Sequence, residues 1–136
     1  MSTRAHIAKL NSDGTSKLVY CHHDGYINYV GKTLHFFYSN PDLVDKLISE
    51  GDMSSLGQTI EKCDFYKDSD SIYPIVFKTK SELMEYVNES LNSDIEYVYI
   101  FDESDYQWHV YFKDYETKEI VEKLVGDLVW KMIKIA

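Results

Sequence analysis

The chain has 136 residues, 23 of them acidic and 14 basic, and a formal net charge of −9 at pH 7. This balance argues against direct binding to nucleic acid, because a phosphate backbone is bound through clustered Lys and Arg. No apolar run approaches the roughly 20 residues of a membrane span, the N-terminus lacks the apolar core of a signal peptide, and two cysteines are too few for a disulfide framework. We therefore expect a cytoplasmic protein without membrane contact.

The first half of the chain predicts a β-hairpin followed by helices. The dipeptide Asp13–Gly14 is a strong turn signal between two alternating segments, and Asp24–Gly25 marks a second turn. Apolar residues then recur at helical spacing, and Asn40 is a suitable N-cap for a further helix. We expect strands over 5–10 and 17–23 and helices over 27–38, 41–50 and 53–61.

The second half predicts a loop, a helix and a second hairpin. Thr79 and Glu82 have the spacing of a capping box ahead of an apolar helical face. The tail has apolar pairs at helical spacing over 120–133, although a break at Gly126 would allow a strand over 128–135. We expect a loop over 64–71, a strand over 73–79, a helix over 80–92, and strands over 95–102 and 106–113.

These elements indicate an α+β fold in a single domain over residues 1–136. Two hairpins and a lone strand form an antiparallel β-sheet, and three to four helices pack on one face of it. A chain of this length suffices for one hydrophobic core of common size.

The segment VYCHHDGYINYVG at 19–31 is dense in reactive side chains. Cys and His bind zinc and related ions, and Asp completes such sites. Side chains alternate along a strand, so Cys21 and His23 are expected to point one way and His22 the other. At most two of them reach one ion, and further ligands would come from elsewhere, such as His6 across the hairpin, His35 or Cys63.

The same segment also has a catalytic and a purely structural interpretation. A Cys21 thiolate needs a histidine that lowers its pKa, and His6 or His109 is better placed for this than neighbours on the same strand. No GxSxG, HExxH, Walker A or GxGxxG pattern supports catalysis. In the structural interpretation Cys21 is buried, and Asp24 forms a turn with Gly25 and caps the next helix.

Several segments together resemble one family. They are MSTRAHI at the start, YCHHDGY at 20–26, Gly31, Leu34, Tyr38, LI at 47–48 and GDMSSLG at 51–57. The chain is similar here to small, mostly uncharacterised proteins of bacterial phages, prophages and mobile elements that open on an S/G-T-R stretch and carry Y-C-H-x-D-G-Y. The match covers about residues 1–60. It implies a bacterial cytoplasm and an accessory role in a phage or prophage, and it brings no catalytic residue with it.

We expect a non-enzymatic binding module that acts on a host protein, for example as an inhibitor of host defence. Small phage proteins often act by binding, charge steers an acidic domain to a basic partner, and rigid Tyr side chains anchor such contacts. The chain holds 12 Tyr. The candidate partner-binding residues are Asp64, Tyr66, Asp68, Asp70, Asp102, Glu103, Asp105 and Tyr106.

The alternative is a small-molecule (nucleotide-like) or metal-binding protein, or a small enzyme, built on the segment Cys21–Tyr26. In this interpretation Arg4 binds an anionic group of the ligand. No cofactor and no particular metal is indicated, and exposed Tyr-rich strands make a homodimer plausible. The candidate ligand residues are Arg4, His6, Cys21, His22, His23, Asp24 and Tyr26.

Overall fold

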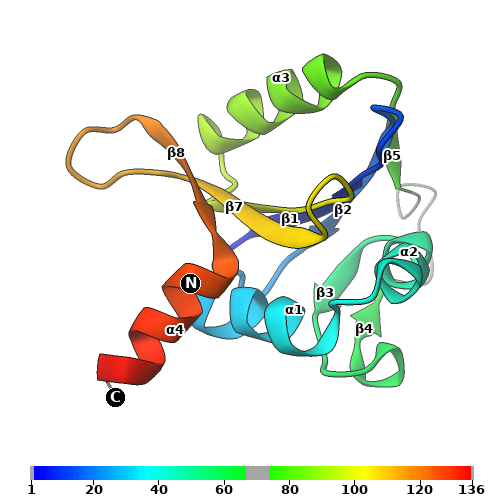
Figure 1. Cartoon of the computed structure of the whole chain (residues 1–136), viewed down its shortest axis with the longest axis horizontal. Coiled ribbons are helices and arrows are strands. Elements are labelled where there is room, and N and C mark those ends of the chain that lie inside the picture. The colour runs from blue at the N-terminus through cyan, green and yellow to red at the C-terminus, as the bar shows by residue number, and fades with distance from the viewer. Residues whose placement is uncertain (1, 67–73, 136) are drawn as a thin grey trace.

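The computed structural model describes residues 2–66 and 74–135 (Figure 1). The strands are β1 (Ala5–Leu10), β2 (Ser16–Cys21), β3 (Met53–Ser55), β4 (Asp64–Phe65), β5 (Ile75–Phe77), β6 (Tyr97–Asp102), β7 (Gln107–Lys113) and β8 (Ile120–Leu124). The helices are α1 (Lys32–Phe37), α2 (Pro41–Ser49), α3 (Lys80–Leu91) and α4 (Val125–Ile135).

Both predicted hairpins are present. β1 pairs antiparallel with β2, and β6 pairs antiparallel with β7. In the first turn Gly14 has φ +92°, and the carboxylate of Asp13 accepts a hydrogen bond from the backbone N–H of Thr15 at 3.0 Å. The turn signal in the sequence therefore marks a real turn, for the conformational reasons that make Asp and Gly common there.

The two hairpins join through parallel pairing of β1 with β6, which gives a mixed, mostly antiparallel sheet. The strand order is β4-β3-β2-β1-β6-β7-β8. The predicted lone strand, β5, pairs with residues 16–18 of β2, while β3 pairs in parallel with Cys21 at the other end of β2. The predicted α+β class is confirmed.

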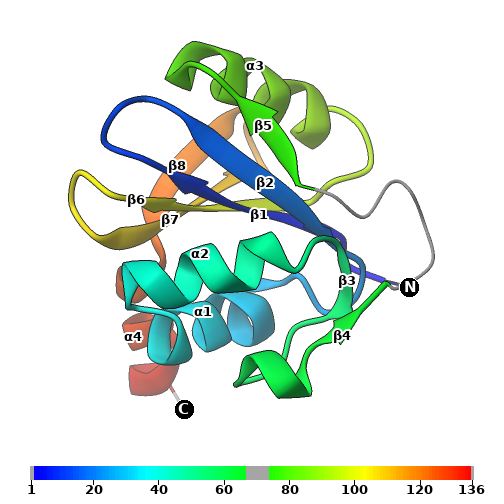
Figure 2. The same ribbon diagram turned by 90° about the vertical axis from the view of Figure 1, so that its right-hand side faces the viewer.

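The helices cover both faces of the sheet, and the prediction that they pack on one face is wrong. α3 lies on one side, and α1, α2 and α4 lie on the other (Figure 1 and Figure 2). Two clusters of buried side chains match this arrangement, one with Val87 of α3 and one with Leu34 of α1 and Val44 of α2. The cause lies in β1, whose six residues are all buried, because a strand buried on both faces needs a cover on each.

Two segments predicted as helices contain strands. Residues 53–61 hold β3 and the start of a short 3₁₀ turn (Ile60–Lys62). The carboxylate of Asp52, just before them, accepts a hydrogen bond from the backbone N–H of Tyr20 at 2.9 Å. In the tail, β8 pairs antiparallel with β7, and only from Val125 on is the chain helical. Residues 128–135 are therefore helix. Pairing between strands overrides the local helical spacing in both segments.

The remaining elements lie close to their predicted positions. The side chain of Asn40 caps α2 by accepting from the backbone N–H of Asp42 at 2.8 Å, and Thr79 caps α3 by accepting from the N–H of Glu82 at 3.1 Å. The helix predicted over 27–38 consists of a π-helical turn (Ile27–Gly31) and α1. The loop predicted over 64–71 begins with β4, and the rest of it from residue 67 lies outside the described residues.

Candidate functional site

The segment after β2 bends sharply and packs against the N-terminal residues. The backbone N–H groups of His22 and His23 donate to carbonyls of β3 at 3.1 and 2.9 Å, and Asp24 then adopts a left-handed conformation with φ +57°. The N–H of Gly25 donates to the carbonyl of Thr3 at 2.8 Å, and a Cβ at Gly25 would lie 2.8 Å from that oxygen. The N-terminal stretch and the Y-C-H-x-D-G-Y stretch therefore contact each other.

Asp24 forms the predicted turn but does not cap the helix that follows. Tyr26 occupies the N-cap position of the π-helical turn, and no side chain caps it. Asp24 contributes its backbone carbonyl instead, which accepts from the N–H of Val30 at 3.3 Å. Tyr26 is half exposed, and its ring meets the ring of Tyr29 edge-on.

Cys21 is a core residue without the chemistry of a nucleophile. Its side chain is fully buried, and its Sγ lies 3.6 Å from the carbonyl oxygen of His23. Burial raises the pKa of the Cys21 thiol to about 12. The thiol therefore stays protonated at neutral pH, whereas both nucleophilic attack and metal binding need the thiolate.

The two adjacent histidines have separate partners. The Nδ1 of His22 is hydrogen-bonded to the Tyr20 hydroxyl at 2.6 Å, and the Nδ1 of His23 to the Ser2 hydroxyl at 2.9 Å. Their rings meet edge to face, with centroids 4.5 Å apart. Within the described residues, no group of three potential metal ligands includes any member of the Cys21–Asp24 segment. The structure thus does not bring the predicted metal ligands together.

His6 does not lie beside Cys21, so the expectation that His6 completes a site there is wrong. The register of β1 and β2 pairs His6 with Tyr20 and Ala5 with Cys21, which places His6 and Cys21 on opposite faces of the sheet. The His6 ring stacks on Tyr86 of α3, with centroids 5.6 Å apart, and meets Tyr20 edge-on at 6.1 Å.

Arg4 already has an acidic partner. Its Nη1 lies 3.1 Å from Oδ2 of Asp94, which belongs to the loop after α3. Both side chains are largely exposed, so the pair contributes little to stability. Arg4 therefore neutralises a carboxylate close to His6, whereas the sequence predicts it as a free cation for an anionic ligand.

An open groove of about 440 Å³ lies between β1, β2 and α3. Its volume falls within the range of small-molecule sites, roughly 300–1,000 Å³. Aromatic rings, serine hydroxyls and carboxylates share its surface. The lining residues are His6, Tyr20, Tyr86, Glu89, Ser90, Ser93, Asp94 and Ile95.

His6 is the groove residue whose hydrogen bonding is incomplete. Its side chain is 6% exposed, and its Nδ1 has no hydrogen-bond partner among the residues that the structure describes. Burial lowers the pKa of His6 to about 4, against the opposing effect of Asp94, so the imidazole is neutral at pH 7. An unsatisfied buried polar group costs about 1–3 kcal/mol. Nδ1 itself is enclosed by protein atoms, so a ligand in the groove reaches it only when the side chains around it shift.

The surroundings of the groove are acidic. Glu89 and Asp94 line it, and the Asp52 carboxylate, held by the backbone of Tyr20, lies close behind. Burial raises the pKa of both Tyr20 and Tyr86, and the neighbouring carboxylates act in the same direction, while the Arg4 cation opposes the rise at Tyr20. The phenols therefore stay neutral, and the local charge comes from the carboxylates and from Arg4.

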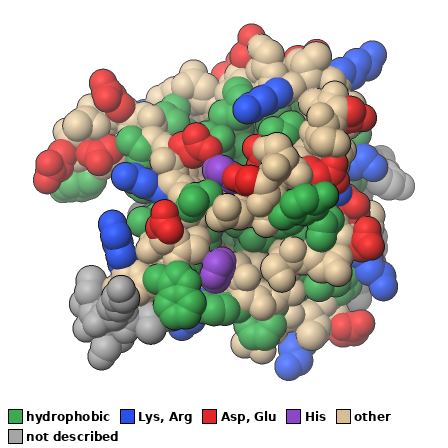
Figure 3. Space-filling view, viewed as in Figure 1, with side chains coloured by type: hydrophobic (Ala, Val, Ile, Leu, Met, Phe, Trp, Pro, Cys, Tyr) green, Lys and Arg blue, Asp and Glu red, His purple; other side chains and the backbone are tan. Residues whose placement is uncertain are grey.

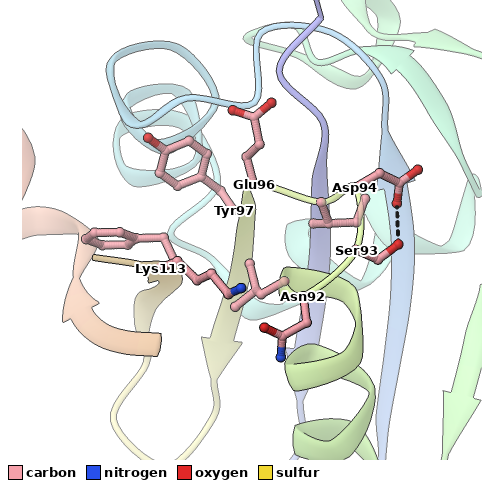
Figure 4. A pocket seen from close by; sticks show the side chains of 9 residues that line it. Asn92, Ser93, Asp94, Glu96, Tyr97 and Lys113 are labelled. Atoms are coloured by element: carbon pink, nitrogen blue, oxygen red, sulfur yellow. Dashed lines mark hydrogen bonds between the residues drawn. The ribbon is translucent and has the colours of Figure 1, made fainter. Parts of the chain in front are cut away.

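A second pocket, of about 470 Å³, lies on the other side of the loop at 92–96 (Figure 4). In Figure 4, Ser93 and Asp94 lie toward the first two strands, whereas Tyr97 and Lys113 lie on the opposite side of the loop. Ser93, Asp94 and Ile95 line both pockets, and the Ser93 hydroxyl donates to Asp94 at 3.3 Å. This loop is therefore the wall between the two pockets.

Several residues of the groove were not predicted from the sequence. Tyr86, Glu89, Ser90 and Ser93 match no motif, but their spacing of three, four and seven residues from Tyr86 places them on one side of α3 and its continuation. This helical spacing is the signal that could have identified them, once His6 and Tyr20 are known to face α3.

The β6–β7 turn contains half of the predicted partner-binding residues. Glu103 lies 3.2 Å from the buried Nζ of Lys9, and Asp105 lies 2.8 Å from Nε2 of His109. Acidic side chains lie next to a histidine in the middle of the face shown in Figure 3. Tyr106 is 60% exposed and has φ +54°, a conformation that bulky residues rarely adopt.

His109 also belongs to a possible cation site that sequence reasoning missed. Ligand atoms of Asp102, Asp105 and His109 lie within 4.8 Å of one another, and the His109 Nδ1 is 2.8 Å from Glu122. Asp102 is already engaged, because its carboxylate accepts from the backbone N–H and the hydroxyl of Ser104. These internal contacts account for the cluster without an ion.

The predicted partner-binding residues do not form one surface. Asp64 lies in β4, the edge strand, and Tyr66 directly follows this strand. The strands β3, β2 and β1 lie between β4 and β6, so these two residues are separated from the β6–β7 turn. Asp68 and Asp70 lie outside the described residues. Tyr66 lies near Tyr20 of the groove, close enough to influence its pKa.

No protein-family model, no curated protein and no solved structure matches the chain. The described helices include none with the length and apolar character needed to cross a bilayer. The phage or prophage origin, the host protein partner, the homodimer and the cytoplasmic location stay predictions.

Proposed function

We propose that this protein is a non-enzymatic binding protein that holds a small molecule in the groove between β1, β2 and α3. The observation that carries the proposal is His6, which is buried, neutral and without a hydrogen-bond partner for Nδ1 among the described residues, at a groove of ligand size. This is the small-molecule alternative of the sequence analysis, based on the opposite face of the hairpin from Cys21.

The chemistry of the groove favours binding over catalysis. A general base works best with a pKa near the operating pH, whereas the pKa of His6 is about 4. Cys21, the predicted nucleophile, is a protonated core thiol on the other face. The aromatic rings and carboxylates around His6 are instead suited to hold and orient a ligand.

The test is a ligand-observed NMR screen of small polar molecules against the wild type and two matched variants. His6→Phe keeps a ring that stacks on Tyr86 and removes both nitrogens, while His23→Phe makes the same change at an exposed position outside the groove. We expect ligands that bind the wild type and His23→Phe but not His6→Phe. A wild type that binds nothing, or ligands that His6→Phe retains, would contradict the proposal.

A second candidate function is recognition of a basic host protein through the β6–β7 turn. Tyr106 favours it, because a large ring that is 60% exposed on a strained backbone, beside the carboxylates of Asp102 and Asp105, is a suitable interface anchor. The groove carries the stronger argument, since Glu103 and Asp105 already have partners within the fold.

This second function predicts a specific loss on truncation of Tyr106. Tyr106→Ala should weaken binding of a host partner by at least about tenfold, whereas Tyr115→Ala, at an 87% exposed ring, should leave it unchanged. Affinity purification from the bacterial host with each variant, followed by calorimetry with the purified partner, measures this. Equal recovery with both variants would remove the turn from the interface.

A further inference from the structure

The rings around the groove leave a polar, aromatic surface. Tyr86 stacks on His6, with an angle of 20° between the ring planes, and Tyr20 meets His6 at a steep angle of 73°. The groove therefore has two tyrosine rings set at different angles around a neutral imidazole. Aromatic faces attract cations through the quadrupole of the ring, most strongly where water is excluded.

Carboxylates complete this surface. Glu89 and Asp94 line the groove, and no Lys or Arg is among its lining residues within the described part of the chain. Arg4, the cation beside it, is held at 3.1 Å by Asp94. Asp52 adds a further carboxylate near both tyrosines. An anion that entered the groove would meet repulsion, whereas a cation would meet carboxylates and ring faces together.

We infer that the groove binds a small organic cation, an ammonium or similar group on a compact apolar body. This inference rests on the proposed function, because it names the chemical class of the ligand in that same groove. The rings of Tyr20 and Tyr86 contact the apolar body, and Glu89 balances the charge, since Asp94 is already paired with Arg4.

Three probes of nearly one shape and different charge test the inference: choline, its neutral carbon analogue 3,3-dimethylbutanol, and the anion 3,3-dimethylbutanoate. NMR titrations at millimolar concentrations, followed at the signals of His6 and Tyr86, give the affinity of each. We expect choline to bind about tenfold more tightly than the neutral analogue and the anion not to bind.

Two glutamates one turn apart on α3 provide the matched variants. Glu89→Gln should weaken choline binding several-fold and leave the neutral analogue unaffected, while Glu85→Gln, outside the groove, should change neither. Binding of the neutral or anionic probe as tightly as choline would overturn the inference and leave the proposed function standing. Failure of all three probes to move the His6 and Tyr86 signals would overturn it too, and the separate NMR screen with His6→Phe would then decide the proposed function.

Discussion

His6 occupies a position where an apolar side chain would suit the core better. On the same face of β1, Ala8 and Leu10 pack with Val87 of α3 in an apolar cluster. A histidine with an unsatisfied nitrogen weakens that face, and natural proteins keep such costs mainly where function needs them. His6 alone is therefore a stronger argument for a ligand site than the Cys21–Asp24 segment, although that segment holds more reactive side chains.

The protonation of His6 should appear in the pH dependence of stability. The pKa of His6 is lowered from 6.5 in an unfolded chain to about 4, so between these values the unfolded chain binds a proton that the folded protein does not. The free energy of unfolding therefore falls as the pH drops through this range, and the His6 contribution to that fall is about 3 kcal/mol near pH 4.

Urea unfolding of the wild type and His6→Phe at pH 7 and near pH 4 measures this contribution. We expect the variant to be at least as stable as the wild type at pH 7, because it buries no unpaired nitrogen, and to lose less stability on acidification. An identical pH dependence in the two proteins would show that His6 is not held neutral by the fold.

At the scale of elements, the hairpin register decides which residues meet. A two-residue loop at Asp13–Gly14 would pair His6 with Cys21, but the observed turn pairs Leu10 with Ser16 and hence His6 with Tyr20. A shift of one residue moves a side chain to the other face of the sheet. Turn signals locate such a hairpin from the sequence, but they do not fix the loop length that sets its register.

The same contrast explains which elements could be predicted. The helices α2 and α3 have caps encoded within a few residues, at Asn40 and Thr79, and both were predicted. β3 exists because Met53 pairs with Cys21, far away in the sequence, and β8 exists because it pairs with β7. The apolar spacing within each segment does not reveal these partners, so the sequence favours a helix at both.

The packing of the N-terminal residues against the bend after β2 gives an element-scale prediction. A Cβ at Gly25 would lie 2.8 Å from both the carbonyl oxygen of Thr3 and the Cβ of Ala5, so Gly25→Ala should cost about 1–3 kcal/mol and loosen residues 2–5. Urea unfolding measures the cost, and amide hydrogen exchange at these residues measures the loosening.

Gly14→Ala is the matched control for this prediction. A Cβ there meets no atom within 4 Å, and its φ of +92° alone should cost about 1 kcal/mol without faster exchange at residues 2–5. If Gly25→Ala leaves exchange at residues 2–5 as slow as in the wild type, the close packing of the two stretches is not what orders the N-terminus.

At the scale of the whole molecule, the groove results from uneven cover of the sheet. β5, whose Phe77 packs with α3, pairs only with residues 16–18 of β2, and α3 ends at Leu91. Near His6 and Tyr20, the end of α3 and the loop at 92–96 therefore form the rim of an open groove. The net charge of −9 adds a general preference for cationic ligands and partners.

The most direct test of the central claim, that the groove is a ligand site, is a map of amide and imidazole NMR shifts as a ligand from the screen is added. We predict that the shifted signals cluster at His6, Tyr20, Tyr86 and the loop at 92–96, and that they vanish in His6→Phe. Shifts confined to Cys21–Tyr26 or to the β6–β7 turn, with His6 and Tyr86 unmoved, would contradict the claim.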